Sequence, residues 1–134
     1  IKIISGLALR KRKFPSCGCG RKSGDEKLFS VIYGNYKDGA KRRGLGFSLS
    51  ESKFRFLIKL NCFYCGSPPN NIIIKRHIPL PPYTGIDRKN NSIGYTVRNS
   101  IPCCKRCNFA KGGSTYKEFI LWIENLTKFR ESLR

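Results

Sequence analysis

Acidic residues are scarce in this sequence: eight aspartates and glutamates stand against 27 lysines and arginines, which gives a formal charge of +19 over 134 residues. Such an excess predicts a polyanionic partner, and nucleic acid is the first expectation. No apolar run is long enough to cross a bilayer, so no membrane partner is expected. The opening segment is apolar and then basic, the reverse of a secretory signal. The length leaves room for one domain and a small appendage.

Apolar periodicity predicts four helices. The first covers residues 28–43, and the second covers 49–60, opened by a capping box from Ser48 to Glu51. A short helix should follow Cys104, and a terminal helix should follow the capping box from Thr115 to Glu118. We expect that terminal helix to bury an apolar stripe made of Phe119, Ile120, Trp122, Ile123, Leu126, Phe129 and Leu133.

Short strands are predicted between the helices, at residues 71–74, 84–88 and 94–96, the last two joined by the turn-forming KNNS. The fold class is therefore α+β. Residues 1–24 have no helical or strand period and form a basic N-terminal arm, so the main domain is expected to cover residues 25–134.

Two C-x-x-C pairs, Cys62 with Cys65 and Cys104 with Cys107, predict a structural zinc site with four thiolate ligands. Buried free thiols are the alternative. Cys103 is expected to face the core beside the ligand Cys104. Cysteines used for metal rather than for disulfides indicate a reducing, intracellular compartment.

Asp87 is the only acidic residue between Glu51 and Glu118, in a stretch rich in lysine and arginine. It could simply pair with a neighbouring cation. The sharper hypothesis is that Asp87 binds a divalent metal, because metal-assisted hydrolysis of DNA needs a hard oxygen ligand. Asn108 is positioned to supply a second oxygen.

The string C-x-Y-C-G…G-I-D-R-x5-G-Y-x3-N-x2-P-x-C-x2-C-N-x2-K, over about residues 60–112, resembles the zinc-bound HNH endonucleases of the ββα-metal superfamily. It is most similar to small phage-type proteins and to rare-cutting restriction enzymes of the PacI kind. The resemblance implies a small ββα-metal core flanked by helices. It also implies that Asp87 and Asn108 bind a catalytic Mg²⁺ or Mn²⁺, that Asn99 holds the loop backbone, and that Gly94 and Tyr95 shape the second strand.

The resemblance further implies a nucleic-acid surface, and its expected residues are Arg88, Lys89, Lys105, Arg106 and Lys111. Arg88 is the departure from the family pattern, because a histidine that deprotonates the attacking water usually follows the aspartate. An arginine cannot act as a base at neutral pH, although it can clamp a phosphate.

The base must then be a tyrosine, a metal-bound hydroxide or a distant histidine. Tyr64 and Tyr83 are candidates, although each is more typical of packing. His77, the only histidine, lies ten residues upstream of Asp87 in a proline-rich stretch.

In the N-terminal arm, Cys17 and Cys19 resemble the closing half of a small zinc ribbon found beside HNH domains. The arm is therefore either a remnant of such a ribbon or a flexible basic segment. Its basic residues should contact phosphates in either case.

Two functions remain open. The first is a metal-dependent HNH endonuclease acting on double-stranded DNA, in the manner of homing or restriction enzymes, with a homodimer needed for a double-strand cut. The second is a catalytically inactive HNH fold that binds RNA or a ribonucleoprotein. The missing histidine favours the second function, whereas Asp87, Asn99 and Asn108 favour the first. A viral origin would place the protein in the host cytoplasm, or in an organelle.

Overall fold

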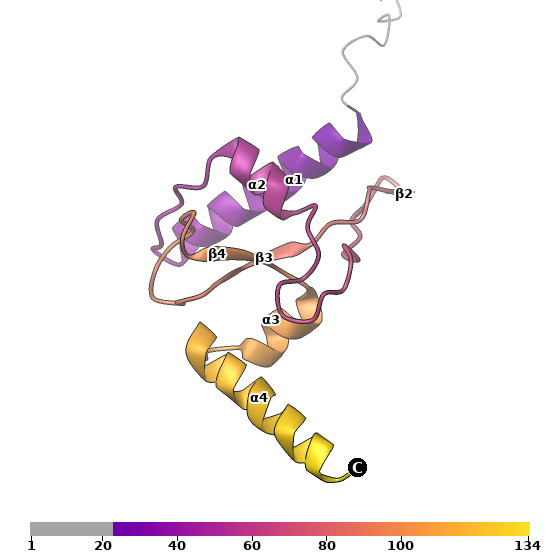
Figure 1. Ribbon diagram of the computed structural model, residues 1–134. Helices are drawn as coiled ribbons and strands as arrows, with labels where there is room; N and C mark the ends of the chain where they lie inside the picture. Colours follow the sequence, from indigo (N-terminus) through magenta and orange to yellow (C-terminus); the bar gives the residue numbers. More distant parts are fainter. Residues whose placement is uncertain (1–22) are drawn as a thin grey trace, which may run out of the picture.

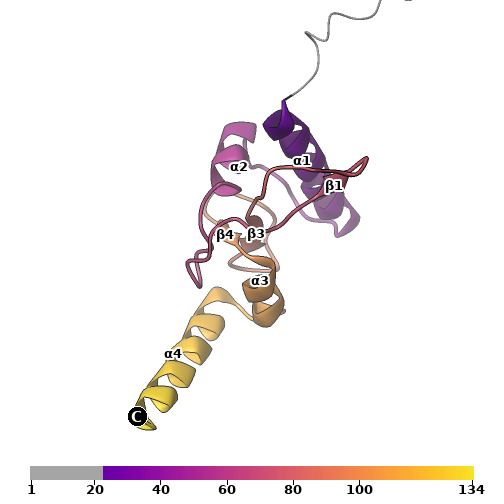
Figure 2. The ribbon, with the colours of Figure 1, turned by 90° about the vertical axis from the view of Figure 1, so that its right-hand side faces the viewer.

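The computed structural model describes residues 23–134, which form a small α+β protein with four helices, two hairpins and a four-cysteine cluster (Figure 1). The α+β prediction is confirmed. In both ribbon views, α1 and α2 lie on one side of the β3–β4 hairpin and α3 on the other, while α4 extends away from the body (Figure 2). The elements are α1 (Gly24–Arg42), α2 (Glu51–Leu57), β1 (Ile74–Lys75), β2 (Ile78–Pro79), β3 (Gly85–Arg88), β4 (Ser100–Cys103), α3 (Lys105–Lys111) and α4 (Tyr116–Ser132).

Side-chain caps determine where the two long helices begin. Ser23 and Glu26 form a capping box that starts α1 a turn before the predicted position. Gly44, with φ 65°, follows the end of α1. The predicted capping box of Thr115 and Glu118 opens α4.

The start of α2 differs from the prediction. Ser50, not Ser48, is its N-cap, and its hydroxyl accepts from the Lys53 amide at 3.3 Å. The Ser48 hydroxyl instead bonds the Tyr95 carbonyl oxygen at 3.4 Å. The helix ends at Leu57, three residues short of the predicted end.

The partner of β3 also differs from the prediction. Residues 94–96 form no strand; β3 pairs with β4, in a register that places Asp87 opposite Ile101. Tyr95 makes a single bridge with Phe47, and a Cβ at Gly94 would collide with the Gly46 backbone. This segment therefore lies against the chain after α1, and the eleven residues between β3 and β4 form a loop.

The predicted strand at 71–74 is mostly absent. β1 begins at Ile74 and forms a hairpin with β2, whose turn contains His77. Asn71 makes only an isolated bridge with Tyr83.

The main core lies between α1, α2 and β3, around the fully buried ring of Phe54. Tyr36 of α1 holds β3 against this core, because its hydroxyl accepts from the Ile86 amide at 2.7 Å. The other buried members are Leu28, Phe29, Ile32, Ala40, Leu49, Leu57, Ile58, Leu80, Ile86 and Tyr95.

The predicted burial of the α4 stripe is wrong. Only Phe119 is buried, against Tyr64 at 4.9 Å between ring centroids. Trp122, Leu126, Phe129 and Leu133 are 45–61% exposed. The helix points away from the body, so the rest of the chain within residues 23–134 offers no surface to cover them (Figure 2). No helix in that part of the chain is long and apolar enough to cross a membrane.

Candidate active site and metal cluster

The thiols of Cys62, Cys65, Cys104 and Cys107 all lie within 4.8 Å of one another. This arrangement is consistent with a structural zinc site, which takes four thiolates in a tetrahedron. Hydrogen bonds from Ser67 lower the pKa of Cys65 to about 6, whereas burial raises the pKa of Cys107 in the same cluster. Cys103 lies outside the cluster; it is buried and its thiol donates to the Cys104 carbonyl oxygen.

The cluster joins distant parts of the chain. Cys62 and Cys65 follow α2, whereas Cys104 caps α3 and accepts from the Cys107 amide at 3.4 Å. The Phe63 amide adds a bond to the Pro102 carbonyl oxygen at 2.9 Å. The ββα unit made by β3, β4 and α3 is thereby tied to the end of α2.

Asp87 is a buried residue of β3, and each of its carboxylate oxygens has a donor. The Tyr64 hydroxyl donates to Oδ2 at 2.9 Å, and the Lys111 ammonium lies 3.3 Å from Oδ1. Pairing with a neighbouring cation, the simpler expectation for Asp87, is therefore observed. Each oxygen keeps a lone pair for another ligand.

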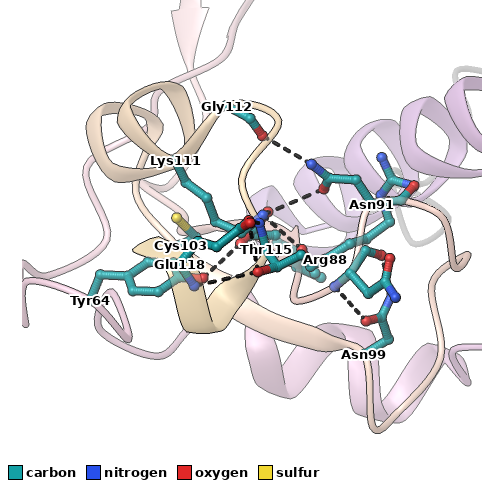
Figure 3. A network of polar contacts seen from close by, with 12 residues as sticks. Tyr64, Arg88, Asn91, Asn99, Cys103, Lys111, Gly112, Thr115 and Glu118 are labelled. Atoms are coloured by element: carbon teal, nitrogen blue, oxygen red, sulfur yellow. Dashed lines mark hydrogen bonds and ion pairs between the residues drawn. The ribbon is translucent and has the colours of Figure 1, made fainter. Parts of the chain in front are cut away.

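Lys111 does not lie on a surface that faces nucleic acid, contrary to the expectation from the sequence. Its side chain is 0% exposed, because the ammonium pairs with Asp87 and also donates to the Arg88 carbonyl oxygen and to Asn91 Oδ1, at 3.0 and 3.4 Å (Figure 3). Asn91 in turn donates to the Gly112 carbonyl oxygen at 3.0 Å. These bonds join the end of α3 to the loop after β3.

The buried amide of Asn99 organises the same loop. Its Oδ1 accepts from the Asn90 amide at 2.9 Å, and its Nδ2 donates to the carbonyl oxygens of Asn90, Ile93 and Gly94 at 2.9–3.1 Å. Asn99 therefore acts on the loop backbone and does not line the cavity described next.

A cavity of about 290 Å³ opens in front of Asp87. Arg88 and Arg43 both line it, and Arg43 Nη2 lies 3.3 Å from the Tyr95 hydroxyl. Arg88 Nη1 donates to the carbonyl oxygens of Asn91 and Ile93, and its guanidinium lies over the Tyr95 ring at 5.4 Å. The lining residues are Arg43, Ile86, Asp87, Arg88, Asn91, Tyr95, Asn108 and Gly112.

Sequence reasoning missed Arg43 and the place of Tyr95 in this cavity. Arg43 follows α1, about forty residues from Asp87, and only the packing of α1 on β3 brings the two together. Its one signal in the sequence is the basic run Lys41–Arg43 at the end of the predicted first helix, where cations favour the helix dipole.

The three base candidates from the sequence do not line this cavity. Tyr64 lies behind Asp87, and burial, followed by the Asp87 charge, raises its pKa. Burial also raises the pKa of Tyr83, which lines other cavities. His77 is exposed in the β1–β2 turn.

The other residues expected to contact nucleic acid lie on α3 and in the loop that follows β3. Lys105 and Arg106 are exposed on α3. Lys89 is half-buried, with its ammonium over the Tyr116 ring at 5.9 Å. Cys17 and Cys19 of the N-terminal arm lie outside the described residues.

No model of a known protein family matches this chain. It is 32% identical over 102 residues to an uncharacterized protein of Acanthamoeba polyphaga mimivirus; the match covers 76% of this chain and 17% of that protein. The chain thus spans about a sixth of the relative's length. Among solved structures, it is similar to the rare-cutting HNH restriction endonuclease PacI, with a TM-score of 0.58 and 19% identity, over 85% of this chain and 92% of that one. The fold is therefore HNH-like.

The oxygen donors that line the cavity are of the chemical type that a divalent metal binds. Asp87 and Asn108 both line the cavity and both offer the hard oxygens that Mg²⁺ and Mn²⁺ prefer. The Asn108 side chain is exposed and makes no hydrogen bond among residues 23–134. Lys111 and Tyr64 would support Asp87 from behind, as hydrogen-bonded neighbours orient metal ligands elsewhere.

Proposed function

We propose that the chain is a metal-dependent HNH endonuclease that hydrolyses phosphodiester bonds in double-stranded DNA. One observation carries the proposal: an HNH-like fold brings two guanidinium groups, Arg43 and Arg88, into one cavity with Asp87 and Asn108. The guanidinium groups suit a phosphate, and the two oxygen donors suit a divalent metal. The charge of +19 would attract the DNA.

In this proposal Asp87 and Asn108 hold Mg²⁺ or Mn²⁺. When bound, the ion would supply Lewis-acid activation of the scissile phosphate. The four-cysteine cluster holds zinc for structure only, because a closed set of thiolates leaves no open position for substrate.

The chain's own residues would bind and orient the substrate. Arg88 and Arg43 would hold the phosphate oxygens and offset the charge that develops in the transition state. Tyr95 contacts both guanidinium groups, Arg43 through its hydroxyl and Arg88 through its ring face, and would hold them in position toward the phosphate. Asn99 and Lys111 are positioning residues, whereas Lys89, Lys105 and Arg106 would contact the DNA backbone. A double-strand cut would require a homodimer.

A second candidate is a catalytically inactive HNH fold that binds RNA or a ribonucleoprotein. The Lys111 ammonium favours it, because a buried cation 3.3 Å from Asp87 lowers the charge available to a divalent ion. Arg88 in the place of the usual histidine favours it as well.

Nicking of a supercoiled plasmid with Mg²⁺ or Mn²⁺ tests the proposal. Asn108→Ala should abolish cutting and leave the fold intact, because the Asn108 side chain is exposed and makes no hydrogen bond within residues 23–134. Asp87→Ala should abolish cutting with equal or higher affinity, and its melting temperature must be compared because Lys111 loses its partner. Asn125→Ala and Asp38→Ala, both at exposed positions, are the matched controls.

Tight binding without any cutting by the wild type would support the inactive binder. Cutting retained in Asp87→Ala would reject Asp87 as a metal ligand.

A further inference from the structure

A second cavity, of about 500 Å³, meets the active-site cavity at Asn108, which lines both. Its floor includes the backbone of Gly85, the first residue of β3. The lining residues are Tyr36, Asn70, Asn71, Ile72, Tyr83, Gly85, Cys103, Lys105 and Asn108. The two cavities are thus neighbours that share the Asn108 side chain.

Several polar groups of this second cavity have unused hydrogen-bonding capacity. The side-chain amides of Asn70, Asn71 and Asn108 make no hydrogen bond within residues 23–134, and neither does the Lys105 ammonium. Tyr36 differs, because its hydroxyl is engaged by the Ile86 backbone. Three amides that lack partners offer three pairs of donors and acceptors to a ligand.

We propose that this second cavity faces the edge of the base pair next to the phosphodiester in the active-site cavity, and that Asn70 and Asn71 read an A·T pair there. The inference rests on the proposed function. Amide side chains pair with adenine in the major groove and distinguish A·T from G·C in the minor groove. The Tyr83 ring, also in the cavity wall, provides an apolar surface that suits the methyl group of the thymine.

The lining favours a base over a second phosphate. The active-site cavity has two guanidinium groups, whereas the second cavity has one cation, Lys105, among three amides. An asparagine amide can donate to a phosphate oxygen, but its paired donor and acceptor are both used only at the edge of a base, as in the bidentate contact with adenine. Lys105 is placed to contact the backbone of the same nucleotide.

Selection of bound duplexes from a randomised DNA library, followed by sequencing, tests this inference in the full chain. The wild type should prefer A·T at one position or more by roughly tenfold, the scale of one good amide contact. The double variant Asn70→Ala, Asn71→Ala should lose that preference while its mean affinity changes by less than about threefold. Lys105→Ala should weaken binding to all sequences alike, and Asn125→Ala should match the wild type.

An unchanged preference in the double variant, or a wild type that binds DNA with no preference at all, would overturn the inference. Failure of the proposed function is distinguishable: a wild type that selects A·T through Asn70 and Asn71 but never nicks a plasmid would retain the base site and lose the nuclease. A chain that binds no DNA would reject both.

Discussion

The ββα unit and α4 differ in what they bury. In the ββα unit, Asp87, Asn99 and Lys111 are buried and each has hydrogen-bond partners at 2.9–3.4 Å. In α4, large apolar side chains such as Phe129 lie in the open. From residue type alone, the polar and charged side chains of the ββα unit would be expected at the surface and the apolar side chains of α4 in the core. The comparison teaches that burial follows from the neighbours that the fold supplies, and that a charged side chain is buried where its partners are present.

Removal of metal from the four-cysteine cluster should produce the largest effect. The ligands come from the end of α2 and from the β4–α3 junction, so chelation should unfold the ββα unit and its packing on α2. A structural zinc contributes on the order of 10 kcal/mol to folding. Circular dichroism with and without a chelator, together with the zinc content per chain, measures this effect.

Cys103 provides the matched control for the zinc prediction. Cys104→Ala should lose the zinc, whereas Cys103→Ala should keep it because the Cys103 thiol lies outside the cluster. A chain stripped of metal that keeps its circular dichroism spectrum would contradict a structural role.

Lys111→Met should give the next largest effect. It leaves the Asp87 carboxylate buried without its cation, and loss of one partner of a buried pair costs about 3–5 kcal/mol. Urea unfolding gives the free energy. The double variant Asp87→Asn, Lys111→Met should recover part of the loss, because it removes both charges.

The matched control is Lys105→Met on the same helix, which should change the free energy of unfolding by no more than about 0.5 kcal/mol. Equal effects at the two lysines would remove the distinction between a buried and a surface lysine on α3.

Asn99→Ala should destabilise the protein by about 1–3 kcal/mol, because it leaves buried backbone groups of the loop without partners. It should also speed hydrogen exchange at the Asn90 amide. The control Asn125→Ala on α4 should change neither the stability nor the hydrogen exchange of the Asn90 amide. An Asn99→Ala protein with wild-type exchange in the loop would show that the loop holds its shape without this side chain.

The smallest effect is expected on α4. Phe129→Ala should change the free energy of unfolding by no more than about 0.5 kcal/mol because the ring is 61% exposed. Phe119→Ala, its buried counterpart on the same helix, should cost about 3–5 kcal/mol. If Phe129→Ala proved equally costly, something would cover α4 in solution, and the contrast with the ββα unit would fail.

Local signals predicted much of the fold. The capping box at Thr115 and each C-x-x-C pair act over a few residues, so the start of α4 and the two pairs of thiols could be predicted directly. The tertiary structure brings the two pairs into one cluster. The strand that pairs with β3 could not be predicted in this way. Gly94 and Tyr95 lie against Gly46 and Phe47, a segment distant in the sequence, and therefore do not pair with β3.

The sequence by itself determined the α+β class, the two C-x-x-C pairs and the isolation of Asp87 as an acid among cations, since these depend on residue type and short spacing. Only the tertiary structure decided that Lys111 is the partner of Asp87 and that Arg43 shares its cavity. These relations join α1, β3 and α3, and no spacing along the chain encodes how those elements pack. The exposed face of α4 has the same origin: periodicity defines an apolar side, and packing alone determines whether that side is covered.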